Sequence, residues 1–254
     1  LVVRPRTMHH FHIVSTQRNA GSGINACLDS IHGQHYPRDR FHHLVIDDAS
    51  TDDTPVRIQR WCDEHPGHSV DLVLRNRRRG GTANTLDGIG LGPPSSLVIE
   101  LNGDDWLPDP GVLAFLNRVY QDPSVWMTYN TQRESTGAIP FQLPPPRAVR
   151  AARSYRDHPW ATSHLHSFRR ELFDHVPHEV MIDPATGELW LSADDAALYL
   201  YMLELAGDHA RHIFRVTYVY NFHEQTEYRV DRQGQLDRAG RIRQFPRAKA
   251  LTGL

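Results

Sequence analysis

Two pairs of adjacent aspartates are the residues of this sequence best suited to chemistry, and the first is Asp104-Asp105. This pair follows the apolar segment 96–101, on a turn that contains Gly103. Two carboxylates on a tight turn at a strand end form an oxygen-rich corner that suits a hard cation such as Mg²⁺ or Mn²⁺. Such a cation can bridge diphosphate oxygens and neutralise a leaving group. A solvated turn is an equally good interpretation of these residues alone, because Asn, Gly and Asp are common in turns.

The second pair, Asp194-Asp195, opens a predicted helix over 193–206. Carboxylates at that position complement the helix dipole and its free N–H groups, so capping is the favoured interpretation of the pair alone. A general base must in addition lie within hydrogen-bonding reach of a bound hydroxyl, which a sequence does not show. His223 follows the apolar segment 215–220. A histidine in such a setting is more often a structural or surface group than a metal ligand.

A basic run from Arg75 to Arg79 precedes Gly80-Gly81, where the backbone can approach a ligand closely. The run could hold phosphates. However, the chain has 28 basic and 30 acidic residues, for a net charge of −2. A solvated loop is therefore the favoured interpretation, and the charge gives no reason to expect a nucleic-acid partner.

The elements that must position these residues alternate between strand and helix in the first half of the chain. We expect strands over 12–15, 43–46, 71–74, 96–101 and 125–129, and helices over 24–32, 82–89 and 111–120. A further helix is expected in the segment 50–65, which starts with N-cap candidates. This alternation predicts a mostly parallel sheet with right-handed crossovers. In such sheets ligands bind outside the carboxyl ends of the strands. Residues 16–19, Asp47-Asp48 and Asp104-Asp105 follow these ends, which predicts a ligand site there.

The second half is less regular. Residues 131–160 are rich in Pro and Arg and predict a loop or mobile flap, followed by helices over 167–175 and 193–206 and a strand over 215–220.

The apolar runs of the sequence are far shorter than the roughly 18 residues of a membrane span, and we expect no signal peptide. Two cysteines give no disulfide framework. We therefore expect a cytoplasmic protein. A basic tail could make peripheral contact with the inner face of a membrane, but a tail that is solvated or forms an oligomer is the favoured interpretation.

Taken together, the motifs resemble those of glycosyltransferase family 2, whose members have the GT-A fold. The similar segments, in chain order, are HIVSTQRNAGSGINACLDSIHGQHYP, VIDDASTDDT, LRNRRRGGTANTLDGI, ELNGDDWLPDPGVL, LSADDAALYLYMLELAG and VYNFHEQTEY. They resemble, respectively, the opening strand and helix, the second-strand motif, the nucleotide-facing loop, the metal-binding turn, the helix of the catalytic base and the C-terminal histidine segment. The match covers about residues 10–229.

The resemblance implies an α/β GT-A fold with a Rossmann-like, mostly parallel central sheet flanked by helices, and a smaller antiparallel portion on the acceptor side. It implies a single domain over residues 1–230. Residues 10–130 would bind the nucleotide sugar. Residues 131–230 would form the acceptor side and carry the catalytic base. Residues 231–254 would then be a polar, basic C-terminal tail.

The resemblance also assigns roles by position. Asp48 would be the residue nearest the nucleobase. The donor nucleotide sugar would be bound by Thr16, Arg18, Asn19, Asp47, Asp48, Asn76, Arg79, Asn84, Asn102, Gly103 and Asp104. Asp104 and His223 would bind the metal, Mn²⁺ or Mg²⁺, and Asp195 would deprotonate the acceptor hydroxyl. The acceptor side would include Asp105, Trp106, Trp160, His164, His166 and Asp194.

The implied activity is transfer of a sugar, with inversion at the anomeric carbon, from a nucleotide sugar to a saccharide, lipid-linked or other hydroxyl acceptor in polysaccharide, glycolipid or glycoconjugate synthesis. UDP is the nucleotide most usual in the family, with GDP and dTDP left open. The family's turn usually begins with Asp, whereas this chain has Asn102, so we expect modest metal affinity. Asp194 likewise stands where Glu is more usual. The alternatives are a non-catalytic nucleotide-sugar-binding domain and, last, a sugar-nucleotide pyrophosphorylase.

Overall fold

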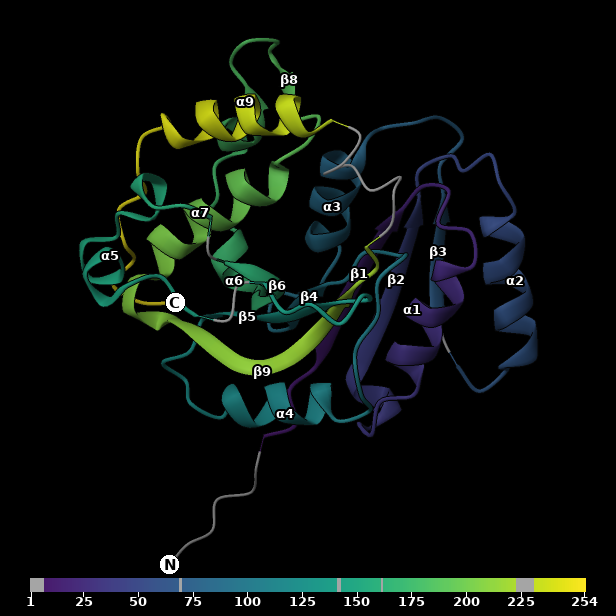
Figure 1. Ribbon diagram of the computed structural model, residues 1–254. Coiled ribbons are helices and arrows are strands. Elements are labelled where there is room, and N and C mark those ends of the chain that lie inside the picture. Colours follow the sequence, from purple (N-terminus) through teal and green to yellow (C-terminus); the bar gives the residue numbers. More distant parts are fainter. Residues whose placement is uncertain (1–6, 69, 141–142, 161, 223–230) are drawn as a thin grey trace, which may run out of the picture.

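A mixed, mostly parallel sheet forms the centre of the molecule (Figure 1). The computed structural model describes residues 7–68, 70–140, 143–160, 162–222 and 231–254. Within them, a seven-stranded sheet has the order β3-β2-β1-β4-β6-β5-β9. The strands are β1 (Phe11–Gln17), β2 (Phe41–Asp47), β3 (Val70–Leu74), β4 (Leu97–Glu100), β5 (Met127–Glu134), β6 (Ser163–Arg169) and β9 (Ala210–Tyr220). Only β6 runs antiparallel to its neighbours, β4 and β5, so the predicted mostly parallel sheet is confirmed.

Helices cover both faces of this sheet. They are α1 (Gly23–His32), α2 (Thr54–Glu64), α3 (Gly81–Gly90), α4 (Val112–Val119), α5 (Arg147–Ala152), α6 (Arg170–Phe173), α7 (Asp194–Ala206) and α9 (Arg232–Arg243). Short 3₁₀ segments are η1 (Arg38–Arg40), η2 (Tyr155–Asp157), η3 (His178–Met181) and η4 (Gly207–His209), and β7 (Ile182–Asp183) pairs with β8 (Glu188–Leu189) in a small antiparallel sheet.

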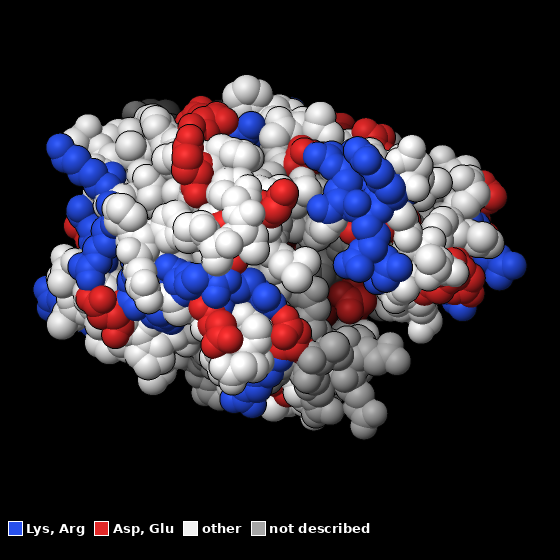
Figure 2. Space-filling model, turned by 90° about the horizontal axis from the view of Figure 1, so that it is seen from above, with Lys and Arg blue, Asp and Glu red and all other residues white. Residues whose placement is uncertain are grey.

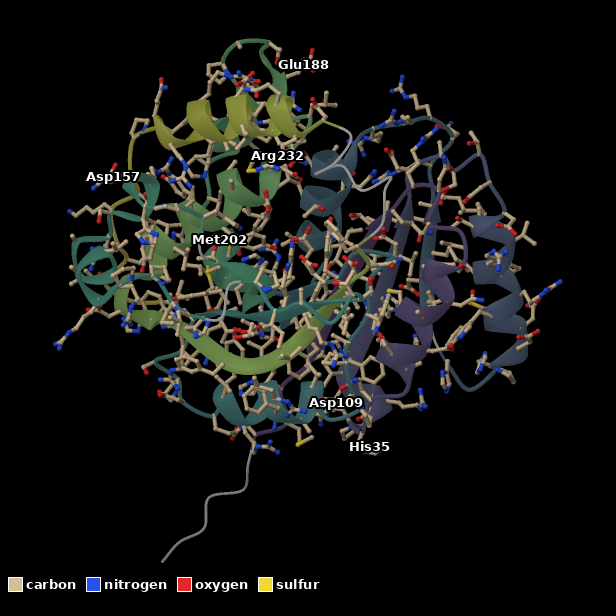
Figure 3. All side chains as sticks on the ribbon, in the orientation of Figure 1. His35, Asp109, Asp157, Glu188, Met202 and Arg232 are labelled. Carbon is tan, nitrogen blue, oxygen red and sulfur yellow. The ribbon has the colours of Figure 1, made fainter. Side chains whose placement is uncertain are left out.

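Side chains that alternate along the strands divide the core into two layers. Ile99 of β4 packs in a cluster with residues of α1, α2 and α4, whereas its neighbour Val98 packs in a second cluster with residues of α3 and α7. Met202 of α7, labelled in Figure 3, is fully buried in this second layer. The helix α3 lies close against β1, because a Cβ atom at Gly88 would collide with the side chain of Val14. The result is the three-layer α/β/α arrangement on which the site depends.

Two expectations for the second half of the chain are wrong. The segment predicted as a helix over 167–175 is strand β6 up to Arg169, and only α6 is helical. A strand that is hydrogen-bonded on both edges and buried on both faces shows no alternation by which to recognise it. The segment 131–160 is not a loose flap: β5 continues to Glu134, α5 follows, and Tyr155 and Arg156 are buried.

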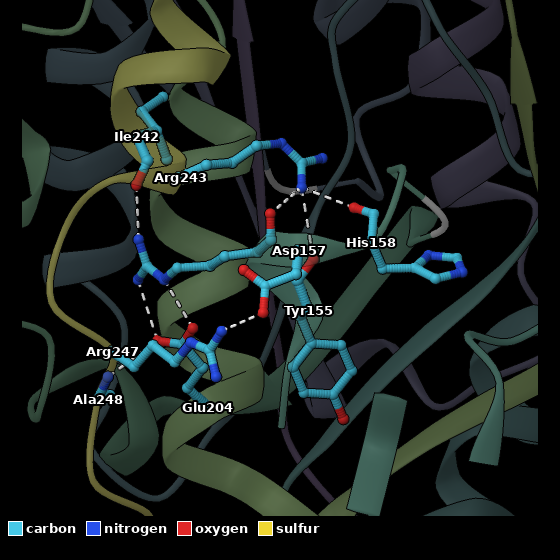
Figure 4. A network of polar contacts seen from close by, with 9 residues as sticks. Tyr155, Asp157, His158, Glu204, Ile242, Arg243, Arg247 and Ala248 are labelled. Atoms are coloured by element: carbon cyan, nitrogen blue, oxygen red, sulfur yellow. Dashed lines mark hydrogen bonds and ion pairs between the residues drawn. The ribbon is translucent and has the colours of Figure 1, made fainter. Parts of the chain in front are cut away.

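The C-terminal segment is not simply a solvated tail, because it packs on α7 and on residues 155–158. The buried Arg156 pairs with Glu204 of α7, with N–O distances of 2.6 and 3.0 Å, and donates to the Ile242 carbonyl at 2.6 Å (Figure 4). The backbone N–H of Ala248 donates to Glu204 at 2.9 Å. Arg243 donates to the carbonyls of residues 156 and 158. Within the described part of the chain, no helix combines the length and apolar character that a membrane span requires.

Candidate active site

The loops that follow β1 and β2 are joined by polar side chains at the carboxyl ends of these strands. Asp47 accepts hydrogen bonds from the backbone N–H of Ser50 at 2.9 Å and from its hydroxyl at 2.5 Å. Asn19 donates its backbone N–H to Ser50 Oγ at 2.9 Å and accepts from the N–H of Thr51 at 2.8 Å. Thr16 is half-buried, and Arg18 and Asn19 are exposed. The structure therefore brings these predicted donor-side residues onto one surface.

Asp48 fixes the loop that leads into α3. Its carboxylate oxygens accept the backbone N–H groups of Arg79, at 2.7 Å, and of Gly80, at 3.0 Å. Burial acts to raise the pKa of Asp48, but these hydrogen bonds outweigh burial and hold the pKa below its ordinary value. Asp48 is therefore an ionised side chain whose position determines the shape of the loop.

Arginines of the same loop form a basic patch beside α3. Arg75 donates to Asn84 Oδ1 at 3.0 Å and to Asp87 at 2.6 Å, and Arg79 also pairs with Asp87. Asn76 is exposed, as are residues 77–79. In Figure 1 this loop lies above the sheet, and the view from above in Figure 2 shows basic side chains gathered beside a hollow with acidic atoms in it. The patch is thus at the strand-end surface on which the sequence predicts a ligand.

The turn after β4 places its two aspartates in different environments. Asp105 is buried and accepts from Tyr218 Oη, from the N–H of Asn221 at 2.6 Å and from Asn102 Nδ2 at 3.2 Å. Burial and the charge of Asp104 raise the pKa of Asp105 to about 7. Asp104 is half-buried and lies against the start of α1, since a Cβ at Gly23 would be 3.1 Å from Asp104 Cα. Asp105 therefore anchors the turn, and Asp104 is the carboxylate nearer the surface.

Other contacts fix the geometry of this turn. A side chain on Gly103 would collide with Gln17, so only glycine fits between the turn and β1. Trp106 exchanges two backbone hydrogen bonds with Val219 at 3.2 and 2.8 Å, which joins the turn to β9. His223, the second predicted metal ligand, lies outside the described residues.

The second aspartate pair lines an acidic cavity at the start of α7. This small cavity is lined by Thr82, Thr85, Leu86, Glu100, Met181, Asp194, Asp195, Leu198 and Tyr199. Burial, together with the charge of Asp195, raises the pKa of Asp194 to about 6, and burial also raises the pKa of Asp195. Carboxyl groups with raised pKa values in a cavity are candidates for proton transfer near neutral pH.

Glu100 is the residue of this cavity that the sequence interpretation missed. It is the last residue of β4, and burial raises its pKa to about 7. The available signal was an acidic residue at the end of the otherwise apolar strand LVIE, two residues before the turn.

The remaining predicted acceptor-side residues do not line the acidic cavity. His166 is fully buried and stacks on the Tyr199 ring at 3.6 Å, behind the cavity wall. His164 stacks on Tyr218 at 4.9 Å, and burial lowers its pKa to about 4. Trp160 lines a different small cavity, with Tyr155 and Leu200 among its other walls. The structure therefore separates these three residues from Asp194 and Asp195.

Comparisons with known proteins agree with this architecture. The family model described as glycosyl transferase family 2 matches residues 13–176. The structure of Staphylococcus aureus TarS 1-349 matches with a TM-score of 0.64 and 16% identity, over 84% of this chain and 60% of that one. The mannosyltransferase PcManGT from Pyrobaculum calidifontis matches with a TM-score of 0.62 and 22% identity, over 97% and 67%. Both are similar to this chain in fold.

A relative in sequence is the uncharacterized protein MT1568 of Mycobacterium tuberculosis (strain CDC 1551 / Oshkosh). The two are 32% identical over 139 residues, which is 55% of this chain and 41% of the relative. This chain thus covers less than half the length of that relative. Because the family model covers more than half of the chain, the chain belongs to glycosyl transferase family 2, a family of transferase enzymes, and it has the GT-A fold.

Proposed function

We propose that this protein is an inverting glycosyltransferase that moves a sugar from a nucleotide-diphosphate sugar, with UDP as the preferred nucleotide, to an acceptor hydroxyl. The synthesis of a polysaccharide, glycolipid or glycoconjugate is the process we infer. The observation that carries this proposal is the acidic cavity, in which Asp195 of α7 faces the end of β4, two residues before the turn that contains Asp104. A proton acceptor and the turn expected to bind the donor diphosphate are thus brought to the same edge of the sheet.

The donor would lie across the loops at the carboxyl ends of β1, β2 and β3. The solved structures include TarS in complex with UDP-GlcNAc and PcManGT in complex with GDP-Man, which supports a nucleotide sugar as the donor. Asp48 and the loop it holds would border the nucleotide base and ribose. The exposed arginines of the loop 75–79 carry charge complementary to a diphosphate. The glycines that follow leave the backbone open to a phosphate, since a Cβ at Gly80 or Gly81 would meet nothing within 4 Å.

A divalent cation, Mn²⁺ or Mg²⁺, would be held by Asp104 and His223. The residues that the structure describes contain no group of three or more His, Cys, Asp or Glu that could hold a metal ion. A half-buried carboxylate at the turn nevertheless fits, because Mg²⁺ is commonly held by one or two carboxylates together with substrate phosphates. The solved structures of PcManGT and GalNAc-T7 contain Mn²⁺. When bound, the cation would stabilise the negative charge of the departing diphosphate.

Asp195 would act as the general base. As the acceptor oxygen bonds to the anomeric carbon, the bond from that carbon to the diphosphate breaks, and the acceptor's proton passes to the Asp195 carboxylate. Burial raises the pKa of Asp195, which makes its ionised form a stronger proton acceptor. Attack from the face opposite the diphosphate inverts the anomeric configuration.

The test is the release of UDP from UDP-GlcNAc and of GDP from GDP-Man. We expect Asp195→Asn to lower kcat by about 10²- to 10⁴-fold, the usual contribution of a general base, while the donor-induced rise in Tm persists. The matched control is Asp208→Asn, an exposed residue just beyond the other end of α7, which should retain activity. Normal turnover by Asp195→Asn would show that Asp195 is not the base. Donor binding by the wild type without any turnover would favour a non-catalytic nucleotide-sugar-binding domain, the alternative that Asn102 suggests.

A further inference from the structure

Glu100 lies where three elements of the proposed site meet. One carboxylate oxygen accepts a hydrogen bond from the Tyr199 hydroxyl of α7, and the other accepts from Thr85 Oγ1 of α3 at 3.2 Å. Glu100 itself ends β4. Helix α7 carries the proposed base Asp195 as its second residue, α3 follows the loop that Asp48 holds, and β4 leads into the turn with Asp104. A single carboxyl group therefore links the three parts that have to act together.

The contact with Tyr199 fixes α7 one turn after Asp195. Tyr199 is four residues after Asp195, so their side chains lie on the same face of the helix, and both line the acidic cavity. The residue that precedes the helix, Ala193, has a φ of +61° and provides no side-chain cap. Within the first turn, the Asp195 carboxylate accepts the backbone N–H of Ala196 at 2.7 Å. Contacts with other elements add to this support: Tyr199 donates to Glu100, and Thr82 Oγ1 donates to the Trp190 carbonyl at 2.5 Å.

The surroundings of this contact make it rigid. Tyr199 is fully buried, and the His166 ring is stacked on its ring at 3.6 Å with an interplanar angle of 13°. The hydroxyl thus has little freedom to turn away from Glu100. Loss of the contact would leave a buried polar group without its partner, which is costly in a low-dielectric cavity.

The contact between Glu100 and Tyr199 requires an oxygen atom that accepts a hydrogen bond, and it does not require a negative charge on Glu100. Burial raises the pKa of Glu100 to about 7, so near neutral pH the group is partly protonated. A neutral carboxyl group still accepts from Tyr199 through its carbonyl oxygen. A glutamine has the same shape and can accept from Tyr199 and bond to Thr85, so it should preserve the arrangement.

We propose that Glu100 is a positioning residue that, through Tyr199, holds Asp195 at a fixed place relative to the turn with Asp104 and to the loop before α3. This inference rests on the proposed function. Because misplacement of a catalytic group by about 1 Å can cost about 100-fold in rate, disruption of the contact should affect the chemical step more than the binding of the donor.

The test measures kcat and KM for release of the nucleoside diphosphate in four variants. We expect Tyr199→Phe and Glu100→Leu to lower kcat by about 10- to 100-fold, with KM changed by less than about twofold, and Glu100→Gln to stay within about threefold of the wild type. Val98→Ala is the matched control, because it removes buried atoms from the same strand without touching the polar contacts. It should lower Tm and leave kcat unchanged.

Three outcomes would overturn the inference while leaving the proposed function intact. In the first, Tyr199→Phe and Glu100→Leu retain the kcat of the wild type. In the second, their loss of kcat matches that of Val98→Ala at equal Tm. In the third, Glu100→Gln is as impaired as Glu100→Leu. Should the wild type show no turnover of any donor, the proposed function fails, and this inference fails with it. A local readout supports the kinetics: amide exchange in residues 194–199 should rise in Tyr199→Phe but not in Val98→Ala.

Discussion

The two halves of this molecule hold their site residues in different ways. In residues 10–130, polar side chains bond to the backbone of nearby strand-end loops, as Asp48 does with Arg79 and Gly80. In residues 131–254, the helix that carries Asp195 is held by buried pairs between side chains distant in sequence, of which Arg156–Glu204 is the clearest. The first arrangement follows from the geometry of parallel strands, and the second depends on particular partners. The two halves should therefore respond differently to substitution.

The largest effect is expected where the buried ion pair of the second half is broken. Both side chains of the Arg156–Glu204 pair are buried, at 1% and 0% exposure. Glu204→Leu therefore leaves a buried arginine without a counter-charge. We expect a loss of about 3–5 kcal/mol in the free energy of unfolding, measured in urea. The same variant removes the acceptor for the Ala248 N–H, so the C-terminal segment should become sensitive to protease.

The double variant Arg156→Met/Glu204→Leu is the control for this prediction. It removes both charges, and we expect it to recover a large part of the lost stability. Equal stability of Glu204→Leu and the wild type would show that the second half does not depend on this pair.

A smaller effect is expected at Asp105, where the two halves meet through Tyr218 of β9. The pKa of Asp105 is raised from 3.8 to about 7, so between these values the folded state binds more protons than the unfolded state. Its contribution to stability therefore decreases as the pH rises from about 4 to about 7. Urea unfolding of the wild type and of Asp105→Asn should give two pH profiles whose difference changes by about 1–3 kcal/mol over this range. Parallel profiles would contradict the raised pKa.

The smallest effect is expected at Asp48 in the first half, where the change is local. Asp48→Ala removes the acceptor of two backbone N–H groups, at a cost of about 1–2 kcal/mol. Asp48→Asn keeps one acceptor oxygen and should cost less. Calorimetric titration with UDP should show weaker binding in the order wild type, Asn, Ala. Unchanged UDP affinity in Asp48→Ala would place the nucleotide elsewhere.

The same difference between the halves explains how much could be predicted from the sequence. The strands β1 to β4 and the helices between them follow from local hydrophobic patterns and turn residues, and the structure confirms them. The end of strand β6, from Ser167 to Arg169, was predicted as part of a helix because its pairing with β4 and β5 leaves no trace in its own residues. Helix α9 was predicted as a tail because its anchors, Arg156 and Glu204, are elsewhere in the chain.

The candidate site shows the same limit. The acidic pairs were found because their position after a strand or before a helix is visible in the sequence. The division of roles between Asp104 and Asp105 was not visible, since it depends on Tyr218 and Asn221 of the second half. Glu100 was missed for a similar reason: its partners Thr85 and Tyr199 come from two other elements.

The most direct test of the central claim is thermal unfolding with UDP, GDP or dTDP, each with and without Mn²⁺. A ligand at one hundred times its Kd adds about 2.7 kcal/mol to the free energy of unfolding, which is readily seen as a rise in Tm. We predict a rise for one of these nucleotides, with UDP favoured, that is larger when Mn²⁺ is present. No rise with any of the three in the presence of Mn²⁺ would contradict a nucleotide site at the strand ends.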